Sequence, residues 1–557
     1  PIDRPLFYGL FVGFLSFKHS LWYPIIFQNL ILAILLFKMY QQFLSSVKNG
    51  MVYLFITLII CALTGVAWFS VQIMPDIFVA IGFFSFVLLL LKPVGKIEKW
   101  TLALIYLMSL AMHNSHMLIF NLLTIFALII IKFNIFSFKV FIPIKKLYFI
   151  LLLSIFSWLI NPTINLIYEG KFKHSGSPYA YLMAKYAENG LLATYLKEKC
   201  VTKRSIANQP EPGVYFLRNL KSNLFLDVEG YSMEAGAKIH QWEYTGADNQ
   251  KFILEKAGNY QKISSVKSGK YVSSYNNDAG KLALKQDNSS INNNQLFELI
   301  FENSSPIVSI KLKDRNAYLS SDTCARAFGM QFIEGNNSKD GYCQFELVSA
   351  ANCFCYFKDS IPSNAMVFLW DSKSILSRTG NWLNHEKEYK IVMHDMLFTP
   401  AYFGRNLNAA LGATVEQLGR NNVGDGIAKY DSTSSPYFAI QNTLPKSSAA
   451  FIESRENKGE LQFVLLNYVN GYLMKISFYL VIILLAMPYF RKKIKPEMLA
   501  LICFTLLILV INAFVTGAMA NILSRLQSRI SWVLPFIVLM LVYNLMEDLN
   551  SDKVIKE

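Results

Sequence analysis

Long apolar runs occur only near the two ends of the chain, and a polar stretch separates them. The N-terminal block carries six runs, at about 21–39, 51–73, 77–92, 100–113, 117–132 and 147–161. The C-terminal block carries three more, near 472–490, 497–514 and 529–546. About 20 apolar residues in a helix span the hydrocarbon core of a bilayer. The pattern predicts an α-helical polytopic membrane protein with about nine transmembrane helices, a short interfacial segment at 5–17, and a large external region at 168–462.

Composition and charge refine this topology. The 557 residues are 53% hydrophobic, with a mean hydropathy of +0.32 and a formal net charge of +15. If the runs alternate, four basic loops fall on one side, which the positive-inside rule makes cytoplasmic: Lys38 and Lys48; Lys92, Lys96 and Lys99; Lys132, Lys139, Lys145 and Lys146; Arg491, Lys492, Lys493 and Lys495. The charge is therefore a topology signal, and we expect no nucleic-acid partner.

Between residues 214 and 348 the pattern changes to short strands that repeat three times. The segments "NQKFIL", "NQLFELI" and "YCQFELV" place phenylalanines 45 and 48 residues apart, at Phe252, Phe297 and Phe345. Each repeat also has an early strand, in "NLFLDVEG", "GKYVSSY" and "NAYLSSD". The Gln-x-aromatic motif at Gln250 and Gln295 resembles that of ricin B-type lectin modules. The pattern predicts an inserted all-β trefoil domain with these phenylalanines in its core.

The first repeat carries a candidate carbohydrate site. A sugar site needs a carboxylate for the hydroxyls, an aromatic face for the C–H surface, and a nearby amide. This repeat supplies all of them, in Asp227, Trp242 and Asn249, with a further hydrogen bond expected from His240 or Gln241. The second repeat has serines at the Asp position and Lys285 at the aromatic position, and the third has "LSS". We expect at most one site, for a cell-envelope glycan; the alternative is a trefoil that acts only as a spacer or protein-contact module.

Helical patterns flank the trefoil on both sides and predict one external helical domain, split by the insertion. Five cysteines lie in the external region, without a partner at zinc-binding spacing, so disulfides are expected rather than a metal site. The expected pairs are Cys200 with Cys355 (or Cys353), and Cys324 with Cys343. The predicted segments are 1–167 and 471–557 (transmembrane helices), 168–200 and 351–470 (external helices), and 201–350 (trefoil).

Ionisable residues at the external ends of the spans form a second candidate site, because the predicted topology places them at one membrane surface. Arginines neutralise a phosphate, a carboxylate can act as general base, and a histidine can orient phosphate or acceptor. This chemistry fits sugar transfer from a polyprenyl-phosphate donor at the surface of the lipid. The candidates are Asp76, His113, His116 and Asp3 for catalysis, and Arg525, Arg529 and Arg4 for phosphate binding. No metal ligands are assigned, and a divalent metal is left open.

The order of parts resembles that of GT-C type glycosyltransferases, and more specifically an uncharacterised bacterial membrane family of this type. The resemblance is carried by "DRPLFYGLFVGFLS", "MPDIF", "HNSH", "SPYAYLMAKYAENGLLATYLKEKC", "CYFKDSIPSNAMVFLW" and "SRLQSRISWVLPF". It implies a transferase in a bacterial inner membrane, with its large domain periplasmic or extracellular.

The chain departs from the transferase pattern in two places. Ser524 and Leu526 replace the Asp and Tyr of an Asp-Arg-Tyr-Gln-x-Arg pattern, and the usual acidic residue of the first external loop is not located. The chain begins at Pro1, so an upstream first helix is an open hypothesis, and Asp76 becomes the best remaining carboxylate. A non-enzymatic membrane protein that binds or handles glycans is the alternative function.

Overall fold

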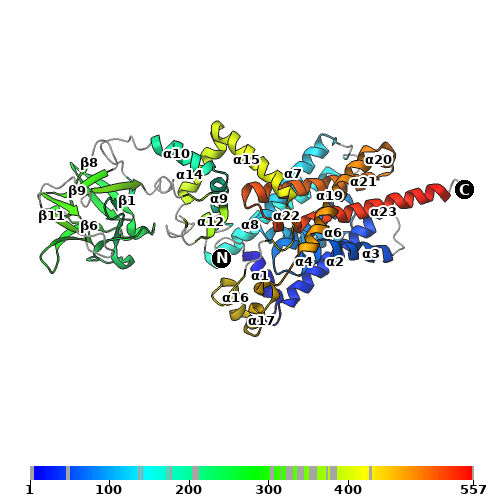
Figure 1. The fold of residues 1–557 in the computed structure, drawn as a ribbon, viewed down its shortest axis with the longest axis horizontal. Helices are drawn as coiled ribbons and strands as arrows, with labels where there is room; N and C mark the ends of the chain where they lie inside the picture. The colour runs from blue at the N-terminus through cyan, green and yellow to red at the C-terminus, as the bar shows by residue number, and fades with distance from the viewer. Residues whose placement is uncertain are drawn as a thin grey trace. The chain divides into compact units, whose positions relative to one another are not determined.

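The computed structural model of the protein divides into two compact units, Pro1–Pro178 with Leu407–Glu557, and Tyr179–Asn406 (Figure 1). The structure describes residues 6–44, 50–135, 138, 142–170, 172–174, 179–202, 213–290, 292–301, 307–313, 315–320, 330–334, 344–349, 361–371, 374, 376, 386–425 and 429–554.

The first unit is helical. Its N-terminal elements are α1 (Leu6–Leu15), α2 (Trp22–Phe43), α3 (Gly50–Leu63), α4 (Val66–Val71), η1 (Pro75–Ile77), α5 (Phe78–Leu91), α6 (Lys96–Ala111), α7 (Asn114–Lys132) and α8 (Ile144–Glu169). Its C-terminal elements follow α15 (Pro400–Gly419): α16 (Ser435–Thr443), η10 (Pro445–Ser447), α17 (Ser448–Ile452), α18 (Arg455–Lys458), α19 (Val464–Ala486), α20 (Pro488–Lys493), α21 (Pro496–Ala513), η11 (Phe514–Ala518), α22 (Ser524–Ser531) and α23 (Val533–Val554).

Within the described residues, six helices are long and apolar enough to cross a membrane, fewer than the nine predicted. They are Trp22–Phe43, Asn114–Lys132, Ile144–Tyr168, Val464–Ala486, Pro496–Ala518 and Ser524–Leu549. The other three predicted runs form the shorter helices α3, α5 and α6. The run at 51–73 forms two helices, α3 and the short α4, which are separated at Thr64 and Gly65 although the sequence stays apolar on both sides. Pro75 then starts the separate turn η1.

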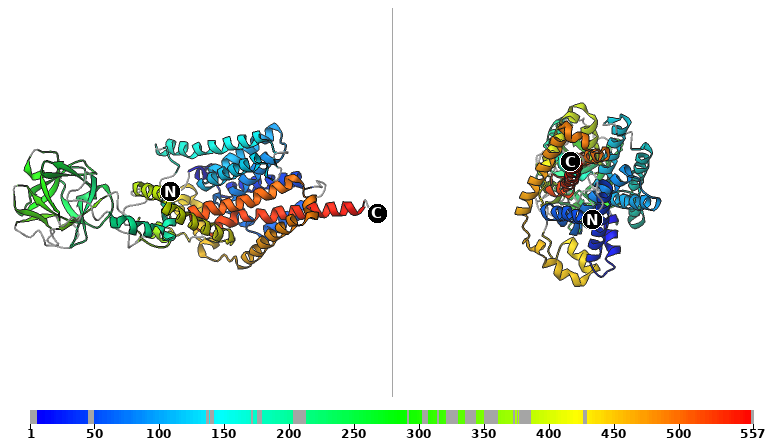
Figure 2. Two further views of the ribbon diagram at one scale, coloured as in Figure 1. Left: turned by 90° about the horizontal axis from the view of Figure 1, so that it is seen from above. Right: turned by 90° about the vertical axis from the view of Figure 1, so that its right-hand side faces the viewer.

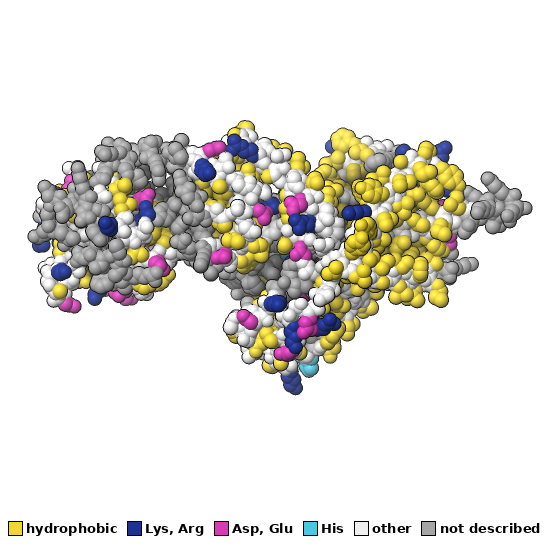
Figure 3. Space-filling model, viewed as in Figure 1, with side chains coloured by type: hydrophobic (Ala, Val, Ile, Leu, Met, Phe, Trp, Pro, Cys, Tyr) yellow, Lys and Arg dark blue, Asp and Glu magenta, His cyan; other side chains and the backbone are white. Residues whose placement is uncertain are grey.

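Apolar side chains cover much of the outer surface of these helices. Figure 3 shows this over the first unit, where Leu54, Phe55 and Ile482 are among the exposed large hydrophobic residues. Helix α5 is different, because every one of its residues is buried. It is therefore the central helix of the unit, and the long helices around it run side by side (Figure 2). The 3-10 turn η1 sits at its N-terminal end and carries Asp76.

Twelve strands form the all-β segment of the second unit: β1 (Gly213–Asn219), β2 (Phe225–Val228), β3 (Ile239–Trp242), β4 (Phe252–Ala257), β5 (Tyr260–Ser265), β6 (Tyr271–Asn276), β7 (Leu282–Asp287), β8 (Phe297–Phe301), β9 (Ile307–Leu312), β10 (Ala317–Ser320), β11 (Gln331–Glu334) and β12 (Gln344–Ser349). Six strands pair in the ring β1–β4–β5–β8–β9–β12 and close again on β1. The hairpins β2–β3, β6–β7 and β10–β11 add one pair per repeat. This is the arrangement of a β-trefoil, as predicted.

The repeated motif residues hold the trefoil together. Phe252, Phe297 and Phe345 lie in its core, at most 1% exposed, which confirms their predicted role. The two motif glutamines are buried and bind the turn that precedes them. Gln250 donates to the Glu243 carbonyl and accepts from the Thr245 amide, at 2.7 and 2.8 Å. Gln295 repeats this pair of bonds with the carbonyl of Asn288 and the amide of Ser290.

Helices on either side of the trefoil in sequence contact each other. They are α9 (Ala180–Glu188) and α10 (Leu191–Thr202) before it, and α12 (Ala365–Trp370), α14 (Glu386–Phe398) and the start of α15 after it. The Tyr195 hydroxyl donates to Asp395 at 2.9 Å, and the Tyr402 hydroxyl donates to Glu198 at 2.5 Å. The cysteines of the predicted disulfides, Cys324, Cys343, Cys353, Cys355 and the Cys200 side chain, lie outside the described residues.

Candidate functional site

The four predicted sugar-site residues of the first repeat lie together. Strand β2 places Asp227 directly opposite His240 of β3. His240 Nε2 lies 3.1 Å from one Asp227 carboxylate oxygen, and Asn249 Nδ2 donates to the other at 3.0 Å. Asn249 comes from the turn η5 (Asp248–Gln250), which packs against β2. The carboxylate is thus fixed in direction by two side chains.

Trp242 adds the aromatic face. It follows His240 by two residues on β3, so both side chains stand on one face of the strand. Their rings stack at 5.6 Å between centroids, with 22° between planes. Trp242 is 36% exposed, whereas Asp227, His240 and Asn249 are at most 7% exposed. A flat, partly exposed ring therefore stands beside a buried, oriented polar group.

Two buried polar atoms of this cluster have no hydrogen-bond partner among the described residues: Nδ1 of His240 and Oδ1 of Asn249. A buried polar atom without a partner costs free energy, and each such case in a folded protein calls for an explanation. Both atoms are shielded from solvent, so hydroxyl groups of a bound sugar would supply these partners only after neighbouring side chains move. The arrangement can therefore bind a polyol through a carboxylate, an imidazole and an amide, with its C–H surface on Trp242.

The second repeat, whose strands β6 and β7 are fully described, lacks this set. In the second repeat Ser273 takes the place of Asp227, and Asn294 donates to it at 2.9 Å, as Asn249 does to Asp227. The register places Lys285 opposite Ser273, which is the position of His240 and not, as predicted, that of the aromatic residue. The equivalent of Trp242 is Asp287, which pairs with Lys285 at 2.8 Å. Lys285 was assigned to the wrong position because the sequence alone did not fix which residues of β6 and β7 face each other in the hairpin.

The second candidate site forms at the end of α5. Arg529 Nη1 donates to Asp76 at 3.0 Å, and Arg525 Nε lies 3.5 Å from the other carboxylate oxygen. Helix α22 presents both arginines, one turn apart. The Arg529 side chain is fully buried, whereas that of Arg525 is 21% exposed. Residues more than 400 positions apart in sequence thus form one charge cluster.

The histidines of "HNSH" border this cluster. His113 Nδ1 lies 2.8 Å from the Ser115 hydroxyl, and Ser115 in turn lies 3.5 Å from Arg529 Nη2. His116 is buried, and its Nδ1 lies 2.9 Å from the Ser109 carbonyl, while its Nε2 has no hydrogen-bond partner within the described part of the chain. The remaining predicted members, Asp3 and Arg4, lie outside the described residues.

Sequence analysis missed three polar members of the cluster. Arg529 Nη2 donates to the Asn512 side chain at 3.1 Å, from the apolar helix α21. Ser115 lies between His113 and Arg529 and contacts both. Asp425 accepts from the Ser524 amide at 2.9 Å, so a carboxylate stands at the start of α22 although Ser524 replaces the expected Asp. A polar residue inside an apolar span, such as Asn512, is the signal that could have found the first of these.

Within this cluster the two arginines, Arg525 and Arg529, both contact the carboxylate of Asp76. Both Asp76 oxygens face guanidinium groups, so its negative charge is already compensated. An anion that entered beside Arg525 would compete with Asp76 for the same donors. Among the described residues, no group of three or more His, Cys, Asp or Glu side chains is placed to hold a metal ion.

Comparison with known proteins identifies the β segment. Residues 205–286 match the family described as "Ricin-type beta-trefoil lectin domain-like". The clotting factor G alpha subunit of Tachypleus tridentatus is 41% identical over 58 residues, 10% of this chain and 9% of that protein. The chain thus spans only a small part of this relative.

Solved structures similar to this segment include designed and natural proteins. The designed three-fold symmetric protein ThreeFoil is 26% identical, with a TM-score of 0.22 over 25% of this chain and 99% of that one. The Macrolepiota procera ricin B-like lectin, solved with lactose, is 16% identical, with a TM-score of 0.22 over 26% and 99%. The chain carries a ricin B-type β-trefoil lectin domain between two sets of helices.

Proposed function

We propose that the first trefoil repeat binds a carbohydrate and that the helical unit anchors it in a membrane. One observation carries the first part: a carboxylate held between His240 and Asn249, beside the exposed ring of Trp242. The family match over residues 205–286 supports it. Apolar surfaces on helices of membrane-spanning length support the second part.

In this proposal, two adjacent sugar hydroxyls donate to Asp227, because a carboxylate accepts several hydrogen bonds at once. His240 Nδ1 and Asn249 Oδ1 then meet further hydroxyls. The apolar C–H face of the ring stacks on Trp242, which contributes buried area beyond the hydrogen bonds. The expected ligand is a glycan of the cell envelope, outside the membrane of a bacterium.

The test compares Asp227→Asn with Ser273→Ala, the same position of the repeat that lacks the set. The full chain in detergent is screened on a glycan array, and its best neutral glycan is titrated. Hydrogen bonds to a charged group contribute about 1.5–3 kcal/mol, so Asp227→Asn should weaken binding at least about tenfold. Ser273→Ala should leave the affinity unchanged. Equal binding by folded Asp227→Asn and the unaltered protein would show that the site is misassigned.

The second candidate function is sugar transfer from a polyprenyl-phosphate donor, as in GT-C type glycosyltransferases. The observation that favours it is the convergence of Arg525 and Arg529 on Asp76. A donor phosphate would take the place of the Asp76 carboxylate at Arg525, the more exposed arginine. Asp76 would then be released to act as general base, with His113 and His116 nearby.

Transfer from a labelled polyprenyl-phosphate sugar tests this function. The unaltered chain in lipid nanodiscs should transfer label, while Asp76→Asn and Arg525→Gln should each reduce transfer by tenfold or more. Arg420→Gln, which removes an exposed arginine that directly follows α15 and pairs with Glu416, is the matched control. If none of these proteins transfers label, the non-enzymatic alternative, a membrane-anchored glycan-binding protein, is favoured.

A further inference from the structure

A second hollow lies in the trefoil, outside the first repeat. It has a volume of about 350 Å³ and is bordered by the β6–β7 hairpin, the turn η6 (Asn293–Gln295) and the chain after β9. Small-molecule sites typically have volumes of about 300–1,000 Å³. The hollow is therefore large enough to accept a sugar unit.

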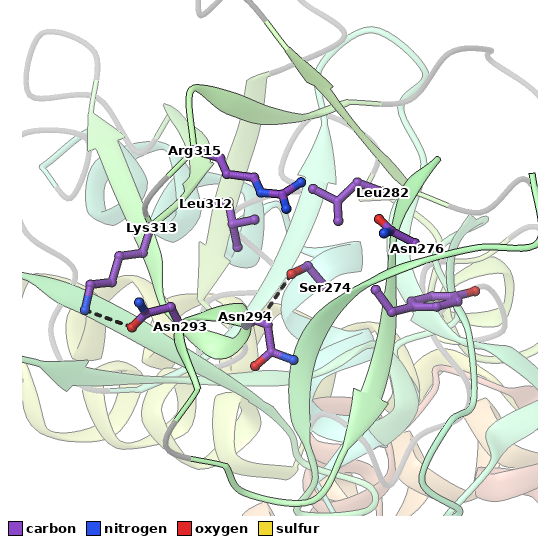
Figure 4. A pocket seen from close by; sticks show the side chains of 9 residues that line it. Ser274, Asn276, Leu282, Asn293, Asn294, Leu312, Lys313 and Arg315 are labelled. Atoms are coloured by element: carbon purple, nitrogen blue, oxygen red, sulfur yellow. Dashed lines mark hydrogen bonds between the residues drawn. The ribbon is translucent and has the colours of Figure 1, made fainter. Parts of the chain in front are cut away.

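This hollow is not the second-repeat counterpart of the Asp227 site. That counterpart is centred on Ser273, whereas the hollow is lined by Ser274, the next residue of β6. Neighbouring side chains on a strand point to opposite faces. Ser274 donates to the Asn294 carbonyl at 3.3 Å (Figure 4), while the Asn294 side chain donates to Ser273 at 2.9 Å. The side chains of Ser273 and Ser274 therefore lie on opposite faces of β6, and it is Ser274 that lines the hollow.

The charge of the hollow is positive. Lys313 and Arg315 line it, and none of the described residues that line it is acidic. Figure 4 shows the Arg315 guanidinium reaching over the hollow towards Leu282. Lys313 instead donates to the Asn293 side chain at 3.0 Å. Arg315 is exposed, and no acidic side chain of the described residues pairs with it, so its fork of donors is available to an anion.

The remaining lining suits a sugar ring. Ser274, Asn276 and Asn293 offer hydroxyl and amide groups, and Leu282, Leu312 and Tyr275 offer apolar surface. A saccharide presents the same mixture of hydroxyls and C–H surface. We propose that this hollow binds a saccharide unit that carries an anionic substituent, a sulfate, phosphate or carboxylate, on Arg315. The assignment is independent of the Asp227 site.

Titration of the full chain in detergent tests this assignment. The probes are glucose 6-sulfate, glucose 6-phosphate and glucuronic acid, with glucose as the uncharged comparison. Arg315→Gln should weaken binding of an anionic probe at least about tenfold, and a rise from 50 to 500 mM salt should also weaken it, because exposed charges are screened. The three anions distinguish which substituent is preferred.

Two matched variants separate this site from other effects. Lys256→Gln removes one exposed positive charge from β4, away from the hollow, and should leave anion binding unchanged. Asp227→Asn should lose the neutral glycan and keep the anionic probe. The assignment is wrong if the anions bind no better than glucose, or if folded Arg315→Gln binds them as well as the unaltered chain.

Discussion

Arg529 is a buried cation whose stability depends on a few named partners. Its guanidinium is fully buried and bonds to Asp76 and Asn512. Removing one partner of a buried ion pair leaves the other charge uncompensated, which costs about 3–5 kcal/mol. The pair also fixes α22 against the turn η1, since the two residues come from these elements. Arg529 therefore holds together the segment that bears the candidate transfer site.

Arg529→Met alone should lower the free energy of unfolding by about 3–5 kcal/mol. Combined with Asp76→Asn, which removes the unpaired charge, the loss should be smaller than the sum of the two single changes. Thermal unfolding of the purified chain in detergent measures all four proteins of this double-mutant cycle. Strictly additive losses would mean that the two side chains do not interact.

Residues near each other in sequence were the easier ones to predict. Asp227, His240, Trp242 and Asn249 lie within one repeat, and hairpin pairing brings them together. Asp76 and Arg529 were placed at one surface by topology alone, and their contact depends on tertiary packing. Asn512 and Ser115 were missed because their role is to contact Arg529, which no local pattern reveals.

At the scale of elements, α10 is joined to α15 by a tyrosine–carboxylate contact outside the predicted spans. Tyr402 donates to Glu198, and Arg405 pairs with the same carboxylate at 3.2 Å. The hydrogen bonds from Tyr402 and Arg405 lower the pKa of Glu198. Burial, and then the bond to Glu198, raise the pKa of Tyr402 to about 12. The stability of this contact is therefore expected to depend on pH, with a maximum between the two pKa values.

This contact should be weakened at both ends of the pH scale. Because the pKa of Glu198 is lowered in the folded protein, its ionised carboxylate stabilises the contact at every pH above the ordinary glutamate pKa of about 4.3. This stabilisation is lost as the pH falls through the lowered pKa. Because the pKa of Tyr402 is raised, its protonated hydroxyl stabilises the contact at every pH below the ordinary tyrosine pKa of about 10. This stabilisation is lost as the pH rises through about 12. The protection factors of residues 191–202, which correct hydrogen exchange for its ordinary dependence on pH, should be highest between about pH 5 and 10.

Tyr402→Phe is the control for this window. It removes the hydroxyl and keeps the ring that packs on Tyr195 at 5.3 Å between centroids. The alkaline increase in exchange, beyond its ordinary dependence on hydroxide, should disappear in this variant. If the variant and the unaltered chain show the same alkaline increase, another group is responsible.

The motif glutamines make a second prediction at this scale. Gln295 is buried and bonds both to the carbonyl of Asn288 and to the amide of Ser290. Gln295→Ala leaves these two backbone groups without their partner, at a cost of about 1–3 kcal/mol each. Urea unfolding followed by tryptophan fluorescence should show the loss, whereas Asn292→Ala, three residues earlier and exposed, should show none. Equal stability of the two variants would contradict the proposed role of Gln295 in stabilising the turn at Asn288 and Ser290.

Element lengths show where sequence reasoning succeeds and where it stops. Strong repetition at Phe252, Phe297 and Phe345 predicted the trefoil, since each repeat must bury the same core position. The apolar runs overestimated the number of spanning helices. Hydropathy does not register that the chain breaks near Gly65 and Pro75, because apolar residues continue on both sides.

At the scale of the whole molecule, the trefoil has the geometry of an inserted domain. Its first and last strands are neighbours, with Tyr215 of β1 opposite Ser349 of β12. Partner residues on paired strands lie about 5 Å apart, so the chain enters and leaves the trefoil at almost the same point. Insertions of this kind leave the host fold intact because they do not force its ends apart.

Replacement of residues 213–349 by a short Gly/Ser linker should therefore preserve the helical part of the chain. The α10–α15 contact between Glu198 and Tyr402 would remain, since neither residue belongs to the trefoil. The shortened protein should elute as a single species in detergent, keep helical circular dichroism, and show the same pH window of hydrogen exchange in α10. It should lose both neutral and anionic sugar binding. Aggregation, or loss of protection in α10, would mean that the helices need the trefoil to fold, and that it is an integral part of the helical domain rather than an insertion.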